Sequence, residues 1–535
     1  MKISTTTGLV GLAPLAAASQ LVWPSKWDEL EDLYTMMSGY GKRGFADALT
    51  TCEFGTFIPG RQNSAEWIRT AFHDAVTHNV EAGTGGLDAS IYFELDRPEN
   101  PGSAFNNTFG FFSGFHNARA TASDLTALGL VVATGACEGP KVPFRAGRVD
   151  AYQEGPPGVP EPSTNLKDTF ATFTKAGFTK EDMTAMVACG HAIGGVHSAD
   201  FPDVTGIKAD PNNDTTVHFQ EDVSRFHNGV VTEFLSGTTK NPLVVASNDT
   251  LNSDKRIFDN DRATMEKLSS TEEFNSMCAD VFARMIDTVP SSVKLTDVID
   301  PYDVKPYVDE LSLDSEGELH FTGSIRFSLS AASGRDANDL SVELVYADRS
   351  GETNATIPTT HAMWQGGLGS GYFGNFVSVE FDTTINAEKG ISNFWIKETT
   401  PSTNITKTHD NQNTGGYKVD DTVLYQLSES CFEVNKVSTG AAPIVVTAMV
   451  RDERASDPLT LAVTKKLPIQ GVIVPKLQVE TTNFEPTGKK LNGWTAFQAN
   501  TTVASQNLRF DIALGGEKPA GVEFQNSNLM PEQCS

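Results

Sequence analysis

The spacing of hydrophobic residues changes once along the chain, and this change divides it into two parts. From residue 27 to about residue 288, apolar side chains mostly recur every three or four positions, which is the period of an amphipathic helix. After a stretch rich in Pro and Asp the period becomes two, as in Ile325/Phe327/Leu329 and Val377/Val379/Phe381. Alternation of this kind is typical of strands with one buried face. The pattern therefore predicts a mainly α-helical domain followed by a β-sandwich-like domain.

The domain boundaries follow from this change and from the N-terminus. The chain begins Met-Lys, and residues 8–18 are small and apolar with an Ala-rich end, as in a secretory signal peptide. A buried first helix is the alternative interpretation. We predict a signal peptide over residues 1–18, a helical domain over 19–288, a linker over 289–310 and a β-rich domain over 311–535.

Charge and cysteine usage narrow the class of protein. The 41 basic and 68 acidic residues give a net charge of −27, so we expect neither nucleic acids nor anionic membrane surfaces as partners. No later stretch reaches the ~18 apolar residues of a membrane span. Six cysteines without a Cys-x-x-Cys motif predict up to three disulfides in an oxidising compartment. Six acceptor sites for N-glycosylation fit the same secreted, extracellular location: Asn106, Asn213, Asn248, Asn354, Asn404 and Asn500.

One predicted helix brings together residues that suit peroxide chemistry. Arg69, Phe72 and His73 follow a potential N-cap at Ser64 and share one helical face, because positions i, i+3 and i+4 lie together. A His beside a fixed positive charge can take a proton from one oxygen of a peroxide and return it to the other. The Arg would stabilise the departing negative charge. A surface Arg next to a structural buried His is the alternative.

Two further motifs have ambiguous chemistry when each is taken alone. Asp74, Asp88, Ser90 and the carbonyl of Gly86 offer the oxygen ligands that calcium prefers, although a solvated turn would look the same. Downstream, His191 ends a predicted helix and is preceded by a Gly, which leaves open space above the imidazole, as a haem face requires. His191 and His197 are alternatively zinc ligands or ordinary core histidines.

The order of these motifs resembles the plant-type haem peroxidase superfamily, particularly its secreted fungal members, over roughly residues 40–285. The resemblance implies that Arg69, Phe72 and His73 form the distal pocket and that Asn100 holds His73. It also implies that His191 is the proximal ligand of a haem b iron and that Asp254 is the carboxylate bonded to His191. Because the Asp254 match is short, Asp259 and Asp261 are alternatives to it.

The same resemblance implies the ions and one disulfide. Asp74, Gly86, Asp88 and Ser90 match the ligands of one distal calcium. Ala192 stands where the secreted members usually have a Ser or Thr that binds a second, proximal calcium, so we do not count on that second ion. Cys52–Cys137 matches a disulfide of the family, and Cys189–Cys278 and Cys431–Cys534 are paired by exclusion.

The resulting functional hypothesis is a secreted haem peroxidase. Such an enzyme reduces hydrogen peroxide by two electrons and oxidises small donors in single-electron steps. Two alternatives from other classes are a non-catalytic wall- or carbohydrate-binding protein and a metal-dependent hydrolase that uses His191 and His197. The β-rich region has no counterpart in short family members, so the resemblance does not indicate its role.

Overall fold

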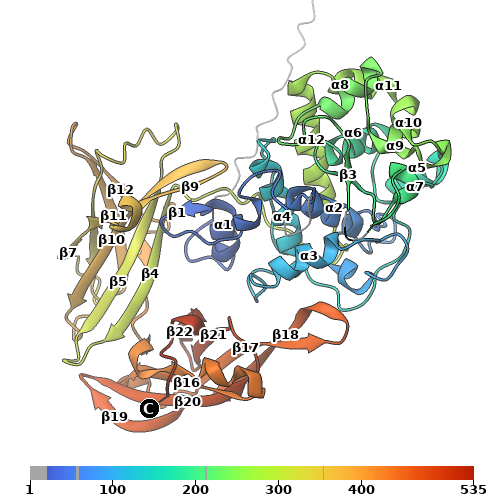
Figure 1. Ribbon diagram of the computed structural model, residues 1–535. Coiled ribbons are helices and arrows are strands. Elements are labelled where there is room, and N and C mark those ends of the chain that lie inside the picture. The colour runs from blue at the N-terminus through green and yellow to red at the C-terminus, as the bar shows by residue number, and fades with distance from the viewer. Residues whose placement is uncertain (1–20, 56–59, 211, 213, 354, 535) are drawn as a thin grey trace, which may run out of the picture.

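The computed structural model describes residues 21–55, 60–210, 212, 214–353 and 355–534. The predicted signal peptide and the acceptor sites Asn213 and Asn354 lie outside the described residues. The helices precede the long strands along the chain (Figure 1), which confirms the predicted order of a helical and a β-rich part. The helices are α1 (Asp28–Thr35), α2 (Asn63–Ala75), α3 (Ala104–Phe112), α4 (Ala122–Ala136), α5 (Leu166–Lys175), α6 (Lys180–Gly190), α7 (Pro202–Thr205), α8 (Gly229–Ser236), α9 (Pro242–Val245), α10 (Ser253–Asn260), α11 (Arg262–Leu268) and α12 (Thr271–Ile286).

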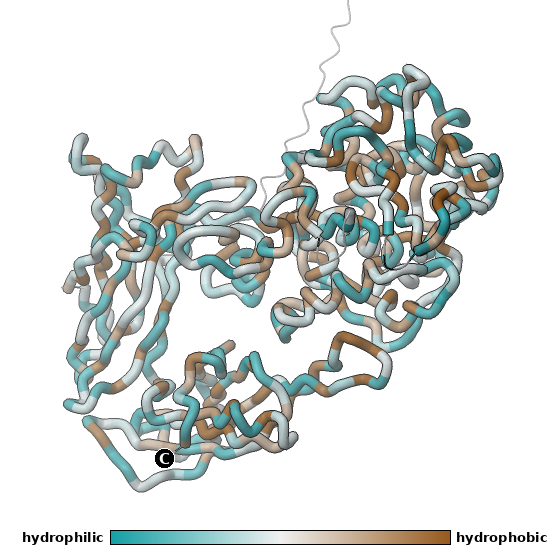
Figure 2. The backbone as a smooth tube through the Cα atoms, in the orientation of Figure 1, coloured by the Kyte–Doolittle hydropathy of each residue, from teal (hydrophilic) through white to brown (hydrophobic). Residues whose placement is uncertain are grey.

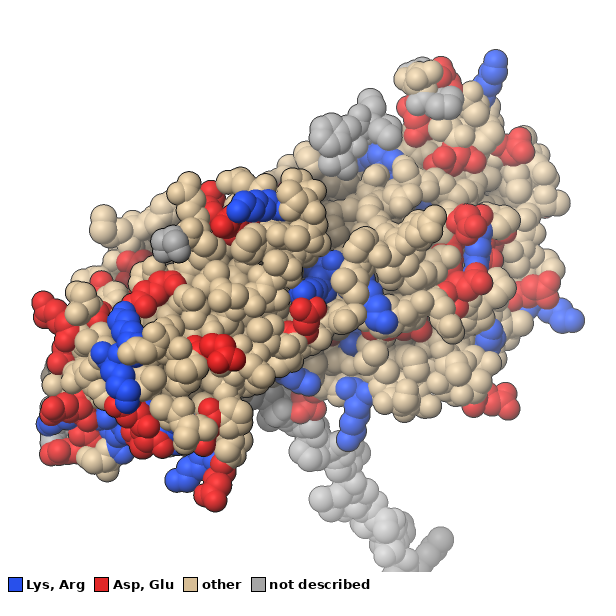
Figure 3. Space-filling view, turned by 90° about the horizontal axis from the view of Figure 1, so that it is seen from below, with Lys and Arg blue, Asp and Glu red and all other residues tan. Residues whose placement is uncertain are grey.

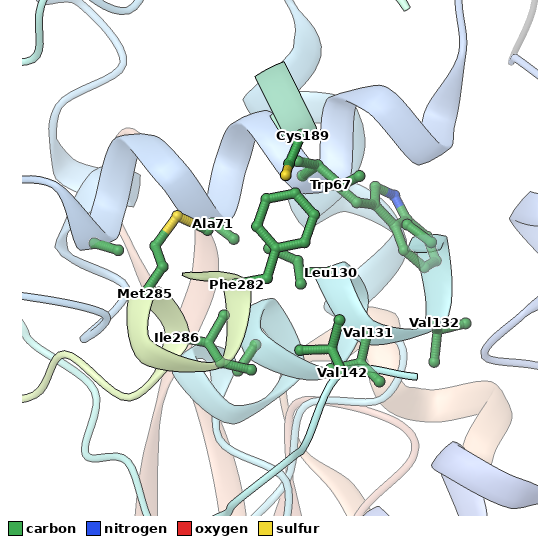
Figure 4. Close-up of a cluster of buried hydrophobic side chains, with 14 of the residues drawn as sticks. Trp67, Ala71, Leu130, Val131, Val132, Val142, Cys189, Phe282, Met285 and Ile286 are labelled. Atoms are coloured by element: carbon green, nitrogen blue, oxygen red, sulfur yellow. The ribbon is translucent and has the colours of Figure 1, made fainter. Parts of the chain in front are cut away.

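The helical part is organised around α4. Thr121 caps this helix by accepting a hydrogen bond from the Asp124 backbone at 3.1 Å. Nearly every residue of the helix is buried and most are apolar, as expected for a central helix. Side chains of α2, α4, α6 and α12 meet around it in a continuous core (Figure 4). Trp67 of α2 and Phe282 of α12 are each at most 2% exposed. This packing fixes α2, the helix that carries the predicted catalytic residues.

All three predicted disulfides are present in the structure. Cys52–Cys137 joins the segment before α2 to the end of α4, and Cys189–Cys278 joins α6 to α12. Cys431–Cys534 closes the C-terminal end of the chain onto a short strand. Two of these bonds lie in the core that surrounds α2 and α6.

The β-rich part consists of antiparallel sheets, none of them closed. A short strand of the helical part, β1 (Ser38–Gly39), joins one of these sheets, and β2 (Gly195–His197) pairs with β3 (Thr216–His218). The remaining strands are β4 (Val304–Leu313), β5 (Leu319–Ser328), β6 (Ser341–Ala347), β7 (Ala355–Pro358), β8 (Thr360–His361), β9 (Leu368–Gly371), β10 (Gly374–Ile385), β11 (Asn393–Thr400), β12 (Ile405–His409), β13 (Tyr417–Lys418), β14 (Val423–Tyr425), β15 (Cys431–Phe432), β16 (Ala442–Arg451), β17 (Leu459–Ile469), β18 (Val472–Asn483), β19 (Glu485–Leu491), β20 (Trp494–Val503), β21 (Arg509–Leu514) and β22 (Ala520–Asn526).

The strands form two sandwiches with separate cores. In the first sandwich, the sheet β1-β9-β10-β5-β4 faces the sheet β12-β11-β6-β7 around one hydrophobic cluster. In the second sandwich, the sheets β14-β16-β20-β19 and β18-β17-β21-β22 enclose a second hydrophobic cluster. The sequence pattern located strands in this region but could not show which strands share a core. β4 is the first strand of the β-rich part, and it begins at Val304, inside the segment 289–310 that was expected to be a linker.

Each sandwich contacts the helical part in a different way. Glu31 and Asp32 of α1, together with Lys305 of β4 and Arg326 of β5, form a fully buried set of ion pairs, which we call the α1 charge cluster. The contact of the second sandwich is apolar: the β17–β18 hairpin reaches the helical part (Figure 1) with a hydrophobic tip (Figure 2). There, Val474 joins the helical core.

The surface agrees with the acidic composition. On the face shown in Figure 3, acidic and basic side chains are interspersed and no continuous basic surface is visible. Among the described residues, no helix combines the length and the hydropathy that crossing a membrane requires.

Candidate active site

A cavity in the helical part collects most of the predicted site residues. Arg69, Phe72 and His73 line it from α2, His191 lines it from the residue after α6, and Asp254 lines it from α10. Much of the remaining wall is apolar: Ile68, Phe173, Met186, Ile193, Ile257, Phe282 and Met285. Asn100 does not line the cavity but bonds to His73 from behind. Residues predicted from separate motifs therefore surround one space.

His73 has one ring nitrogen fixed and the other directed to Arg69. Its Nδ1 donates a hydrogen bond to Asn100 Oδ1 at 2.8 Å, and Asn100 Nδ2 donates to the Glu94 carbonyl at 3.0 Å. The second bond fixes the Asn100 amide with its oxygen towards the His. Nε2 is therefore unprotonated and accepts from Arg69 Nε at 3.3 Å. Burial and the positive charge of Arg69 lower the pKa of His73 to about 3, which keeps the ring neutral and able to accept a proton.

Arg69 supplies positive charge that no carboxylate neutralises directly. Its Nη2 donates to the Pro101 carbonyl at 3.2 Å, and its guanidinium lies 4.7 Å from the centre of the Phe105 ring. In the described parts of the chain it forms no ion pair. Burial lowers its pKa to about 10, so the side chain is still charged near neutral pH. The combination of a neutral imidazole and an unpaired cation suits a ligand that develops negative charge.

His191 is held by a buried carboxylate. Its Nδ1 donates to Asp254 Oδ2 at 2.8 Å, and Asp254 is 1% exposed. Asn241 Nδ2 donates to the same oxygen at 2.8 Å, and the Phe219 ring stacks on the imidazole at 4.0 Å. These contacts fix the ring and leave Nε2 without a hydrogen bond among the described residues. Asp254, rather than its alternatives Asp259 and Asp261, is therefore the partner of His191 in the structure.

The donor set and the shape of the cavity fit a haem. An imidazole whose Nδ1 donates to a carboxylate presents a basic Nε2 as a metal ligand, and the apolar walls suit a porphyrin. A Cβ added at Gly190, the residue before His191, would have no heavy atom within 4 Å. Glycine at this position therefore leaves open space beside the imidazole, where the flat ring of a haem would lie.

The predicted calcium ligands lie together but have protein partners. Asp74 Oδ2 accepts from the Ala89 backbone at 2.6 Å, and Ser90 Oγ lies 3.4 Å from Asp74 Oδ1. Asp88 Oδ1 accepts from the Ser90 backbone at 3.1 Å. Burial and the negative charge of Asp88 raise the pKa of Asp74. Within the described ranges, no group of three His, Cys, Asp or Glu residues is placed to hold a metal, so calcium at these residues stays a prediction.

Gly86 is required by the backbone at this loop. Its φ of +102° is disfavoured for other residues, and a Cβ would lie 2.5 Å from the Thr288 carbonyl. The adjacent Leu87 donates its backbone N–H to the same carbonyl at 2.7 Å. This close approach ties the loop with the predicted calcium ligands to the end of α12.

Several residues in the cavity wall or directly behind it were not identified from the sequence. Asn241 and Phe219 contact the His191–Asp254 pair from loops that carry no motif. Arg61 and Glu66 form a buried ion pair in the cavity wall. Glu66 and Arg69 are three positions apart, so they lie on the same face of the predicted helix. This spacing could have identified Glu66 as a residue near Arg69 from the sequence alone.

His191 and His197 each pair with a different carboxylate. His197 Nδ1 donates to Asp214 Oδ2 at 2.6 Å, whereas His191 donates to Asp254. Asp214 also accepts from the backbone of Ala199 at 2.9 Å. The two histidines both line the cavity but are held in it by separate partners.

Comparisons with known proteins find similarity to peroxidases over the helical part of the chain. A family model described as peroxidase matches residues 52–271. The chain is 35% identical over 530 residues to a WSC domain-containing protein of Arthroderma benhamiae, covering 96% of this chain and 68% of that protein. It is 28% identical over 210 residues to the peroxisomal L-ascorbate peroxidase 5 of Arabidopsis thaliana, covering 39% of this chain and 71% of that protein. It is also 28% identical over 247 residues to a mitochondrial cytochrome c peroxidase of Emericella nidulans, covering 43% of this chain and 66% of that protein.

Proposed function

The chain belongs to the plant-type haem peroxidase superfamily, and from this premise we propose that it is a haem peroxidase that reduces hydrogen peroxide by two electrons. The electrons are returned one at a time by small donors. The observation that carries the proposal is the pairing, in one cavity, of a neutral His73 beside an unpaired Arg69 with a carboxylate-bonded His191. A haem b in this cavity supplies the redox chemistry.

His191 holds the haem iron through Nε2 in this proposal. The hydrogen bond to Asp254 gives the imidazole anionic character, and such a ligand favours the oxidised states of iron. Asn241 and Phe219 keep Asp254 and the imidazole from rotating. His191 would therefore be a fixed and strongly basic ligand of the metal.

His73 moves the proton on the other side of the cavity. Its neutral Nε2 would accept a proton from one oxygen of the peroxide and return it to the other oxygen, which departs as water. Arg69 stabilises the negative charge that develops as the O–O bond breaks. Asn100 holds the ring with Nε2 as the free nitrogen, so the same atom performs both proton transfers.

A calcium ion at Asp74, Gly86, Asp88 and Ser90 is part of the proposal. The buried carboxyl group of Asp74 on α2 and the half-buried one of Asp88 in the following loop both have raised pKa values, because burial disfavours their charged forms, and this supports a cation that would stabilise both charges. We also propose that the protein is secreted, because three disulfides in one chain are typical of an oxidising compartment.

A haem titration of two matched variants tests the proposed ligand. His191→Ala is expected to lose stable haem binding, whereas His197→Ala, in the same cavity wall, is expected to keep the haem absorption band of the natural chain. Equal loss of haem in both variants would contradict His191 as the specific ligand. Hydrolytic activity with added zinc, abolished in both variants, would instead favour the hydrolase hypothesis.

A further inference from the structure

A second cavity, of about 210 Å³, lies where the helical part meets the second sandwich. Its walls come from α1 and the loop after it, from the connection between α3 and α4, and from β21 and the end of β22 (Figure 1). It shares no lining residue with the cavity that contains His73 and His191. Junctions between domains are frequent ligand sites. A cavity of this volume suits a small-molecule ligand.

This junction cavity carries positive charge that the protein neutralises incompletely. Arg509 Nη2 lies 3.9 Å from Glu29 Oε1, and its guanidinium donates no hydrogen bond within the described residues. Arg43 also lines the cavity and pairs at 2.6 Å with Asp32, a carboxylate already engaged in the α1 charge cluster. Burial and the charge of Arg43 lower the pKa of Arg509, and burial and Arg509 lower that of Lys466. The lining thus holds two arginines against one carboxylate, Glu29, and in a chain of net charge −27 this arrangement favours an anionic ligand at the arginines.

A buried histidine forms part of the wall. His116 lines the junction cavity and is 3% exposed. Its Nε2 lies 3.3 Å from Asp150 Oδ2, while its Nδ1 has no hydrogen-bond partner among the described residues. Both ring nitrogens of His116 are shielded from the cavity, so this residue shapes the wall and does not itself bind a ligand.

Four asparagine side chains complete the polar wall: Asn117, Asn507, Asn526 and Asn528. The Asn117 amide is bonded to the backbone, and Asn528 Nδ2 donates to Asn507 Oδ1. Asn507 Nδ2, Asn526 Nδ2 and Asn528 Oδ1 have no hydrogen bond among the described residues, so these groups are available to a ligand. Amides donate and accept hydrogen bonds and so pair with neighbouring hydroxyl groups, while guanidinium groups bind carboxylates in a bidentate manner. We propose that the junction cavity binds a small hydroxylated carboxylate of the hexuronate class. The carboxylate lies at Arg509 and Arg43, and the hydroxyls lie at the asparagine amides. Such a group occurs either as a free sugar acid or at the end of a polysaccharide.

Calorimetric titration of the full-length protein tests the ligand class. Glucuronate is the probe, glucose is the control without charge, and acetate is the control without hydroxyls. We expect glucuronate to bind at least tenfold more tightly than either control. Failure of all three to bind at millimolar concentration would overturn the proposal, as would equal affinity for glucose and glucuronate. A glucuronate trimer then separates the sources: retained binding supports a polysaccharide end, and lost binding supports a free acid.

Two substitutions place the ligand in the junction cavity. Arg509→Gln removes the proposed carboxylate partner, and Asn528→Asp adds a negative charge at an exposed position without changing side-chain size. Both are expected to weaken glucuronate binding at least tenfold. Lys490→Gln, which removes an exposed cation of the same sandwich, is expected to leave it unchanged. Unchanged binding in the folded Arg509→Gln and Asn528→Asp variants would overturn the assignment. Because this readout requires neither haem nor peroxide, it can fail or succeed separately from the proposed peroxidase function.

Discussion

Two arginines, one in the helical part and one in the first sandwich, differ in how their positive charge is balanced. Arg326 of β5 pairs with Glu31 and Asp32 and donates to Thr35 Oγ1 at 2.9 Å. Arg69 of α2 has an imidazole, a carbonyl and an aromatic ring around it but forms no ion pair among the described residues. The first arginine joins α1 to the first sandwich through two ion pairs and a hydrogen bond. The second lies beside a cavity, and no carboxylate among the described residues forms an ion pair with it.

The difference separates structural from functional charge. Removing one member of a buried ion pair strands the other in the interior, which is costly for stability. An unpaired cation next to a cavity costs desolvation in the folded protein, and it is useful only when a ligand or a transition state supplies the opposite charge. Substitutions in the α1 charge cluster should therefore change stability, whereas substitutions around Arg69 should change reactivity.

The largest effect is expected from His73→Leu. This variant removes the proton acceptor but retains an apolar side chain of similar size, so the reaction with peroxide should slow by about 10²–10⁴-fold. Stopped-flow absorption of the haem-loaded protein measures this rate. His320→Leu, in the first sandwich and paired with Asp382, is the control and should react at the natural rate. A His73→Leu variant with the same rate as this control would remove His73 from its proposed role.

Arg326→Met should destabilise the fold while sparing peroxide chemistry. The substitution leaves Glu31 with one cationic partner fewer in the interior, and breaking a buried pair in this way typically costs about 3–5 kcal/mol. Urea unfolding measures the loss. Lys489→Met removes an exposed pair with Glu429 and should cost at most about 1 kcal/mol. Similar losses in the two variants would show that burial does not distinguish these pairs.

Acid should weaken the α1 charge cluster through Asp32. Burial alone would raise the pKa of Asp32, but the positive charges of Lys305, Arg43 and Arg326 outweigh it and hold the pKa below its usual range. The resulting stability is fully present above the unfolded pKa of about 3.9 and is lost as the pH falls through the lower folded pKa. Urea midpoints between pH 5 and pH 2 should therefore fall more steeply for the natural chain than for Asp32→Asn. Parallel curves would exclude this contribution.

The smallest effect is expected at the apolar contact of the second sandwich. Val474 is 7% exposed and packs into the helical core, so Val474→Ala should cost about 1–2 kcal/mol at roughly 0.8 kcal/mol per buried methylene. Val479→Ala on the same strand is the control, because Val479 is 60% exposed. Equal unfolding midpoints for the two variants would indicate that the hairpin does not stabilise the helical part.

Sequence reasoning succeeded where chemistry depends on spacing within one segment. Arg69 and His73 share a helical face because they are one turn apart, and the resemblance added Asn100, His191 and Asp254, which the structure brings to the same site. It could not find Asn241 and Phe219, because only the tertiary fold brings them to His191. The α1 charge cluster was missed for the same reason: Glu31 and Arg326 are far apart in sequence and belong to different parts of the fold.

The strands of the β-rich part were predictable, but their partners were not. The alternating runs at Ile325/Phe327 and Val377/Val379 lie opposite each other on β5 and β10. Alternation gives the buried face of each strand, whereas the division into two sandwiches depends on which faces meet. The junction cavity likewise depends on packing between parts that carry no common motif.

The absorption spectrum of the haem-loaded protein, recorded before and after one equivalent of hydrogen peroxide, tests the proposed peroxidase function most directly. We predict a strong haem band that changes within the mixing time and returns to its starting form after two equivalents of a one-electron donor. The same protein with His73→Leu should bind haem and change far more slowly. Absence of haem binding by the folded natural chain, or a bound haem whose spectrum peroxide leaves unaltered, would contradict the proposal.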